Sequence, residues 1–249
     1  MIIYDNERVD SVNDSLSLIQ KPDGLTFGTD ALLLAGYISG KYSCGAELGG
    51  GSGIISMLLL TRNKISRCTA YEVQKEYAEL IARNAEYNSL SDRLSSVSAD
   101  IRDLPATESF DIVFTNPPYM KSTSGKSNVS DKKAIARHEV FGDIRDFTAA
   151  ASRLLKFGGA FYAVYRPDRL TDIICAMREC SIEPKRVTFV HADTDSEASM
   201  VLIEGKRGGK SGMQLTKPLI IYKDKIHKEY RDEMNYIMEN GSFTPEYKR

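Results

Sequence analysis

The chain has 249 residues, of which 42% are hydrophobic and 27% charged, and its formal net charge is -1. This length suits one large α/β domain or two small ones. The near-zero net charge excludes a uniformly basic, histone-like protein, although 33 Lys and Arg residues can still form a local basic face. The N-terminus lacks the basic-then-apolar order of a signal peptide, and no apolar run is long enough for a membrane span. With four cysteines but no CxxC pair, we expect a cytoplasmic protein with reduced thiols and no metal site.

The first predicted elements form a small unit ahead of the main repeat. Residues 15–20 alternate polar and apolar side chains, and after a Lys-Pro-Asp-Gly turn residues 25–27 complete a hairpin. Thr29 or Asp30 is then expected to cap a helix over 31–38.

From residue 44 onward, strands and helices alternate along the chain. This alternation predicts a mostly parallel sheet with right-handed crossovers, closed by an antiparallel pair. A basic stretch over 206–212, rich in glycine, is expected to be a flexible loop. The predicted strands are 44–48, 67–73, 95–99, 111–115 and 160–165, with two more near 187–191 and 200–204; the predicted helices begin at 54 and cover 75–88, 143–156 and 169–180.

The sequence Asn116-Pro117-Pro118-Tyr119 follows the buried strand 111–115. The two prolines end the strand, since neither can donate to a ladder, and they stiffen the backbone that follows. An amide and an aromatic ring are thus held at the carboxyl end of a strand, the edge where open α/β sheets bind ligands. Together they suit a flat substrate with an exocyclic NH₂ group. The alternative interpretation is an ordinary turn that ends a strand.

A glycine-rich turn links the first strand of the repeat to its helix. Glu47 and Leu48 lead into Gly49, Gly51 and Gly53, which allow the backbone to turn sharply and approach a ligand closely. The dehydrogenase fingerprint GxGxxG would require its third glycine at position 54, which is Ile54. The Lys-Ser/Thr pair of a phosphate-binding P-loop is also missing. Taken alone, such a turn can be a plain flexible loop before a helix.

Acidic residues end the next two strands. Glu72 lies 19 residues after Gly53, and a carboxylate there can accept both hydroxyls of a ribose. Asp100 ends the third strand, where it could accept from the exocyclic amine of an adenine. Each acid alone could be a solvated strand-end charge, but the pair after a glycine turn favours a nucleoside-bearing cofactor.

These residues resemble the class I S-adenosylmethionine-dependent methyltransferases. The segment from Glu47 to Gly53 is similar to their first motif, which usually carries Asp in place of Glu, and Glu72 and Asp100 match their ribose-binding and adenine-contacting acids. Asn116 to Tyr119 resembles the catalytic motif of the branch that methylates planar NH₂ groups. The resemblance covers about residues 25 to 205. It implies a Rossmann-like α/β fold with a mostly parallel, seven-stranded sheet and an antiparallel closing strand, and S-adenosylmethionine as cofactor.

Two further segments narrow the resemblance. Residues 27–34, which include Thr29, and residues 136–139 are similar to the bacterial small-domain methyltransferases that modify adenine in a valine tRNA. Thr29 joins the expected cofactor-binding residues on this basis. The implied organisation is an N-terminal hairpin and helix over 1–40, a catalytic domain over 41–205, and a basic loop with a C-terminal extension over 206–249.

The expected reaction is N6-methylation of adenine in RNA, most directly tRNA near the anticodon. The side-chain oxygen of Asn116 and the backbone oxygen of Pro117 would accept the two amine protons, with Tyr119 stacked on the base. Basic residues would hold RNA phosphates, whereas His138 and Glu139 receive no role. The alternatives are methylation of protein glutamine or of DNA adenine, a non-catalytic RNA-binding module and, less compatible with the motifs, a nicotinamide-dependent oxidoreductase. The expected RNA contacts are Lys121, Lys126, Lys132, Lys133, Arg137, Lys206, Arg207 and Lys210.

Overall fold

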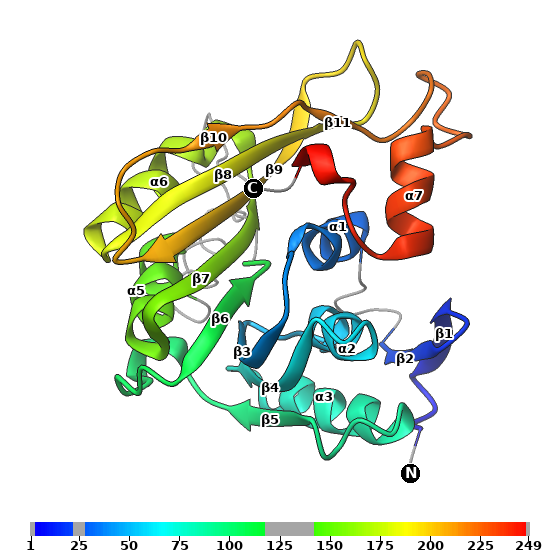
Figure 1. Cartoon of the computed structure of the whole chain (residues 1–249). Coiled ribbons are helices and arrows are strands. Elements are labelled where there is room, and N and C mark those ends of the chain that lie inside the picture. The colour runs from blue at the N-terminus through cyan, green and yellow to red at the C-terminus, as the bar shows by residue number, and fades with distance from the viewer. Residues whose placement is uncertain (1–2, 22–27, 118–141, 248–249) are drawn as a thin grey trace, which may run out of the picture.

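A single large sheet organises the computed structural model, which describes residues 3–21, 28–117 and 142–247 (Figure 1). Its strands alternate with helices along the chain, as the sequence predicts. The seven long strands are β3 (Tyr42–Leu48), β4 (Ile65–Glu72), β5 (Leu94–Ser98), β6 (Phe110–Thr115), β7 (Leu155–Tyr165), β8 (Ile182–His191) and β9 (Ala198–Arg207).

The order of the long strands across the sheet is β8-β9-β7-β6-β3-β4-β5. Only β9 among them runs against its neighbours, β7 and β8, so the expected antiparallel closing pair is confirmed. Within the described residues, the sheet has nine strands rather than the predicted seven. The additional two, β10 (Gln214–Leu215) and β11 (Leu219–Ile220), are two-residue strands that pair parallel with the outer edge of β8. Such short pairings leave no hydrophobic period in the sequence by which they could be recognised.

Helices cover both faces of the sheet. On one face, α1 (Thr29–Tyr37), α2 (Ile54–Thr61) and α3 (Lys75–Tyr87) share one buried apolar cluster with the sheet. On the other face, α5 (Ile144–Leu154) and α6 (Leu170–Glu179) form a second cluster, and Figure 1 shows these two helices opposite α1 and α2. Central strands buried on both faces are hydrophobic almost throughout, which is why they are easy to recognise in the sequence.

The remaining helical elements are short or near the C-terminus. They are α7 (Asp232–Asn240), whose Ile237 packs in the same cluster as α1, and the 3₁₀ turns η1 (Ile101–Asp103), η2 (Pro167–Arg169) and η3 (Pro245–Tyr247).

The N-terminal hairpin pairs differently from the prediction. Strand β2 (Leu16–Gln20) pairs with β1 (Arg8–Asn13), which precedes it, while the predicted partner at 25–27 lies outside the described residues. Two asparagines bind the hairpin: Asn84 of α3 exchanges hydrogen bonds with the backbone of Ile19, and Asn88, the C-cap of α3, does so with Ser17. The half-exposed β1 lacks a clear apolar face, so its pairing is not apparent from the sequence.

Several element ends also differ from the prediction. The N-cap of α1 is Gly28, with no side-chain cap, so Thr29 and Asp30 lie inside the first turn rather than at the cap. Strand β7 starts at Leu155, directly after α5, and β9 continues through Lys206 and Arg207, which were expected in a loop. Both extensions occur where pairing continues across the sheet: Lys206 is opposite Ala160 and Arg207 is opposite Ile182.

Candidate functional site

The strand register brings the predicted site residues to one edge of the sheet. Leu48, the last residue of β3, is level with Thr115 of β6 and with Tyr71 of β4. Asn116 and Gly49 therefore directly follow two neighbouring strands, and Glu72 is the last residue of the third. Since adjacent strands are about 4.8 Å apart, these three positions are neighbours along the carboxyl edge. Thr115 also donates a hydrogen bond from Oγ1 to the carbonyl of Leu48, at 2.8 Å, which ties the ends of β6 and β3 together.

The glycine turn is packed on one side and open on the other. The N–H groups of Gly49 and Gly50 both donate to the carbonyl of Tyr71, at 2.9 and 3.1 Å. A Cβ added at Gly50 would lie 2.8 Å from the side chain of Ile81, whereas one at Gly51 would meet no described atom within 4 Å. Gly51 has a φ of +55°, in the left-handed region that favours glycine. The turn therefore presents bare backbone to open space at this edge.

Glu72 lies beside this open backbone and fixes its shape. Its Oε2 accepts from the N–H of Gly51 at 3.0 Å, and its Oε1 accepts from the N–H of Gln74 at 2.9 Å. The residue is only 4% exposed. Each carboxylate oxygen has lone pairs beyond those used here, so Glu72 can hold the loop and still accept from a ligand hydroxyl.

Asn84 is a further positioning residue, one that the sequence analysis missed. Its Nδ2 donates to the carbonyl of Ser52 in the glycine turn, at 3.0 Å, in addition to its bonds with Ile19 of the hairpin. It is fully buried within the apolar stripe of α3. A lone amide in an otherwise apolar stripe is the signal that could have indicated it, because a buried amide needs partners.

Glu47 points into the protein rather than toward the open side of the turn. It is 1% exposed, and its Oε2 accepts from the backbone N–H of Ser56 at 3.2 Å and from the hydroxyl of the same residue. Burial away from water raises the pKa of Glu47 to about 8. Its observed contacts join β3 to α2, and a direct cofactor contact stays a prediction.

Asp100 and Thr29, the remaining predicted cofactor-binding residues, lie after β5 and at the start of α1. Asp100 follows β5, and its carboxylate accepts from the guanidinium of Arg102 and from that residue's backbone N–H, at 2.9 Å for the latter. This hydrogen bonding with Arg102 lowers the pKa of Asp100. Thr29 is the first residue of α1 and is partly buried. The ligand contacts of both residues stay predictions.

Asn116 has one satisfied and one unsatisfied end. Its Nδ2 donates to Oδ2 of Asp30 at 2.8 Å, across 86 residues of sequence. Its Oδ1 is buried and has no hydrogen-bond partner among the described residues. Pro117 beside it is also buried, while Pro118 and Tyr119 lie outside the described residues. A buried acceptor without a donor costs free energy, so this oxygen is a candidate acceptor for a donor that arrives with a ligand.

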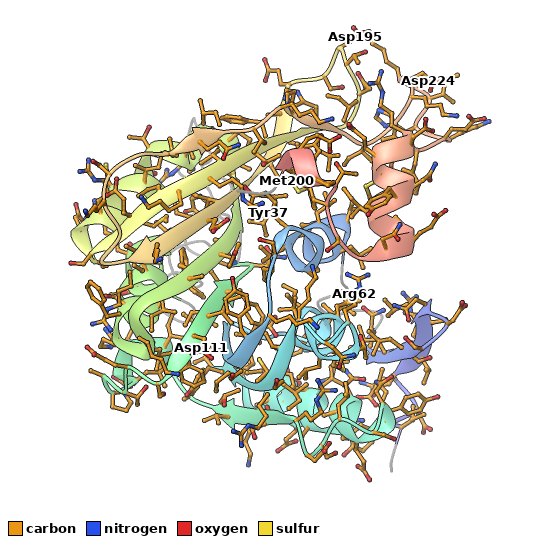
Figure 2. All side chains as sticks on the ribbon, viewed as in Figure 1. Tyr37, Arg62, Asp111, Asp195, Met200 and Asp224 are labelled. Carbon is orange, nitrogen blue, oxygen red and sulfur yellow. The ribbon has the colours of Figure 1, made fainter. Side chains whose placement is uncertain are left out.

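The basic residues expected to bind RNA divide into two groups. Those between Lys121 and Arg137 lie outside the described residues. The later group lies at the amino edge of the sheet, away from Asn116: Arg207 donates to the carbonyl of Leu155 and pairs with Glu108 at 2.6 Å, close to where β6 begins. Asp111, labelled in Figure 2, marks this edge by accepting from the N–H groups that open β3.

Two of these residues also have contacts or positions that the sequence did not indicate. Lys206 is level with Ala160 within the sheet, and the carbonyl of Lys210 accepts from the ammonium of Lys185. A role in RNA binding for Lys206, Arg207 and Lys210 stays a prediction, and it requires RNA that reaches the opposite edge from Asn116.

In the parts of the chain that the structure describes, no group of three or more His, Cys, Asp or Glu side chains is placed to hold a metal ion. Among the helices of those same parts, none has the length and apolar character needed to cross a membrane.

The amino-acid sequence is similar to those of known proteins. The family model of the methyltransferase small domain matches residues 23–171, more than half of the chain. The chain belongs to this family. A relative from Aeromonas hydrophila, named tRNA1(Val) (adenine(37)-N6)-methyltransferase, is 29% identical over 183 residues, which cover 73% of this chain and 76% of the relative. A protein of the same name from Porphyromonas gingivalis is 28% identical over 188 residues, covering 71% of this chain and 72% of that protein.

The fold has close counterparts among solved structures. A predicted O-methyltransferase from Agrobacterium tumefaciens superposes with a TM-score of 0.70 and 24% identity, covering 86% of this chain and 98% of that one. This similarity confirms the class I methyltransferase fold. Membership of the family likewise confirms the expectation of a methyltransferase.

Proposed function

We propose that this methyltransferase transfers the methyl group of S-adenosylmethionine to the N6 amine of an adenine in RNA, most directly in tRNA near the anticodon. The observation that carries the proposal is the buried Oδ1 of Asn116, which has no hydrogen-bond partner within the described residues and lies one strand away from the glycine turn. An acceptor held ready in this way fits a donor that arrives with the substrate, and an exocyclic amine is such a donor.

The residues at the sheet edge fit the cofactor. The open side of Gly51 leaves room for a ligand against bare backbone, and the carboxylate of Glu72 beside it can accept ribose hydroxyls. Asp100, one strand further along the edge, can accept from the adenine amine with lone pairs not used by Arg102. When bound, S-adenosylmethionine supplies an electrophilic methyl group on its sulfonium sulfur.

The chain's own residues would prepare the amine. The lone pair of an adenine amine is delocalised into the ring, so the nitrogen is a weak nucleophile. In our proposal, Oδ1 of Asn116 and the backbone oxygen of Pro117 accept hydrogen bonds from its two N–H groups, which favours a more tetrahedral nitrogen with a localised lone pair. Tyr119 would stack on the base, an interaction worth about 1–3 kcal/mol. Positioning and polarisation of this kind need no covalent enzyme intermediate.

The choice of tRNA adenine is supported by the names of the relatives at 28–29% identity. The physical argument points the same way, because a base must leave its stack to enter such a pocket. An anticodon loop presents unpaired bases, so the cost of extracting one is small.

To test this proposal, the protein is incubated with radiolabelled S-adenosylmethionine and, in separate reactions, with tRNA, ribosomal RNA, duplex DNA or a release-factor protein as the acceptor. We expect label in tRNA with the wild-type chain, none with Asn116→Ala, and wild-type labelling with Asn240→Ala, an exposed asparagine at the end of α7. Label only in protein glutamine or only in DNA would overturn the RNA assignment. Binding of tRNA without any transfer would identify a non-catalytic RNA-binding module instead.

A further inference from the structure

We propose that Asp30 is a positioning residue that turns the side-chain amide of Asn116, so that its oxygen faces the substrate amine. The inference rests on the function proposed above. Asp30 lies in the first turn of α1, and its two carboxylate oxygens have separate partners. Oδ1 accepts from the backbone N–H of Ala31 at 2.9 Å, and Oδ2 accepts from Nδ2 of Asn116 at 2.8 Å.

The carboxylate determines which end of the amide points outward. An ionised carboxylate only accepts hydrogen bonds, whereas an Asn side chain has a donor end and an acceptor end. In the flipped orientation, the oxygen of Asn116 would face Oδ2 of Asp30 and two acceptors would oppose each other. The NH₂ end would then point to the substrate and meet a second donor, the amine. The carboxylate of Asp30 therefore keeps the Asn116 amide in the orientation in which its oxygen can accept from the amine.

The position of Asp30 also depends on α1, whose C-terminal end is anchored by buried cations. Lys64 is buried, and its ammonium donates to the carbonyls of Ala35, Gly36 and Ile38 at 2.7, 3.1 and 2.6 Å. The buried guanidinium of Arg186, in β8, donates to the carbonyl of Tyr37 at 3.0 Å. Tyr37, labelled in Figure 2, ends α1 between that helix and the sheet.

The two ends of α1 therefore have complementary charges. Cations bind its C-terminal carbonyls and a carboxylate lies in its first turn, which is the arrangement that the helix dipole favours. The anchored helix presents Asp30 to Asn116 before any substrate binds, so the amide is already oriented when the amine arrives. Preorganised hydrogen-bonding groups are the kind that contribute most to catalysis.

The decisive variant is Asp30→Asn, which changes one atom of the contact. If the new side chain keeps its oxygen on the N–H of Ala31, its NH₂ faces Asn116 and favours the flipped amide. We expect the single-turnover rate of methyl transfer to fall about 10- to 100-fold, as expected for a lost hydrogen bond to a charged group. The affinity for S-adenosylmethionine should stay within about twofold, because the described bonds of the Asp30 carboxylate go to Ala31 and Asn116 and not to the glycine turn or Glu72.

A matched control is Glu76→Gln, which removes a first-turn carboxylate from α3, where it pairs with Lys21 at 2.6 Å. We expect this control to keep the wild-type transfer rate. A rate for Asp30→Asn within twofold of the wild type would overturn the proposal. So would equal losses in both variants, since these would indicate a general effect of helix charge.

A second readout does not depend on any acceptor. In the wild-type chain, we expect the side-chain NH₂ of Asn116 to show slow hydrogen exchange by NMR, because Asp30 holds it in a partly buried pair. Asp30→Asn should accelerate that exchange. Fast exchange in the wild type would overturn the positioning role even if no variant folds. Slow exchange combined with no methylation of tRNA would leave the geometry intact and reject only the proposed function.

Discussion

Replacing Glu47 by Gln should change how the stability of the protein depends on pH. Glu47 is 1% exposed and bonded to Ser56, and its pKa is raised from 4.5 to about 8, first by burial and also by the nearby charge of Glu72. Between these two pH values the folded protein holds a proton that the unfolded chain has released. The stabilisation is therefore complete below about pH 4.5 and is lost progressively as the pH rises toward 8.

The magnitude follows from the difference between the two pKa values. Each pH unit within this interval lowers the free energy of unfolding by about 1.4 kcal/mol, and the whole interval amounts to roughly 5 kcal/mol. Glu47→Gln keeps a carbonyl oxygen for the hydroxyl of Ser56 and has no proton to lose. Relative to the wild type, the variant should therefore become steadily more stable as the pH rises.

The assay is urea unfolding followed by circular dichroism at several pH values from about 5 to 8. Other groups titrate in both proteins, so the difference between the two free energies isolates position 47. Glu79→Gln, on the exposed face of α3 with the parent side chain 64% accessible, serves as the control and should give a flat difference. A flat difference for Glu47→Gln as well would refute the argument that burial keeps this carboxyl protonated.

Three further changes test other parts of the structure. Glu72→Ala should weaken binding of S-adenosylmethionine at least about tenfold in calorimetry, since it removes charged acceptors, and unchanged affinity would contradict its role. Lys64→Met should lower the free energy of unfolding in urea by about 3 kcal/mol, because three carbonyls at the end of α1 lose their donor; a loss under about 1 kcal/mol would show that Lys64 does not anchor this helix end. Asp143→Ala removes the capping box of α5 and should cost about 1 kcal/mol in the same assay, and no measurable loss would show that the cap is dispensable.

Much of the fold can be predicted because buried parallel strands have a simple pattern. The run from Phe110 to Thr115 is apolar at almost every position and ends at Asn-Pro-Pro, so both the strand and its end are apparent. Glycines at 49, 51 and 53 mark the turn before α2, and all three have the positive φ that makes glycine suitable. Parallel pairing then places the ends of β6, β3 and β4 together, which is how the sequence locates the candidate site.

The parts that could not be predicted depend on contacts between distant residues. Nothing near Asp30 in the sequence indicates that its carboxylate meets Asn116, and the cap role predicted for it instead is wrong. In the sequence, nothing distinguishes Arg186 from a solvent-exposed charged residue on a strand. In the structure it is fully buried, with its guanidinium 3.8 Å from the ring centre of Tyr37 and paired with Glu204. Buried polar groups of this kind are set by tertiary partners rather than by local pattern.

The proposed role of Asn116, which is to prepare an adenine amine for methylation in tRNA, can be tested on the reaction product itself. The most direct measurement incubates the wild-type chain with S-adenosylmethionine and unmodified tRNA, digests the tRNA to nucleosides and identifies the methylated product by mass spectrometry. We expect N6-methyladenosine from the wild type and its loss in Asn116→Ala, with cofactor affinity unchanged within about twofold. Methylation at any other atom of the nucleosides, or an Asn116→Ala variant as active as the wild type, would contradict it.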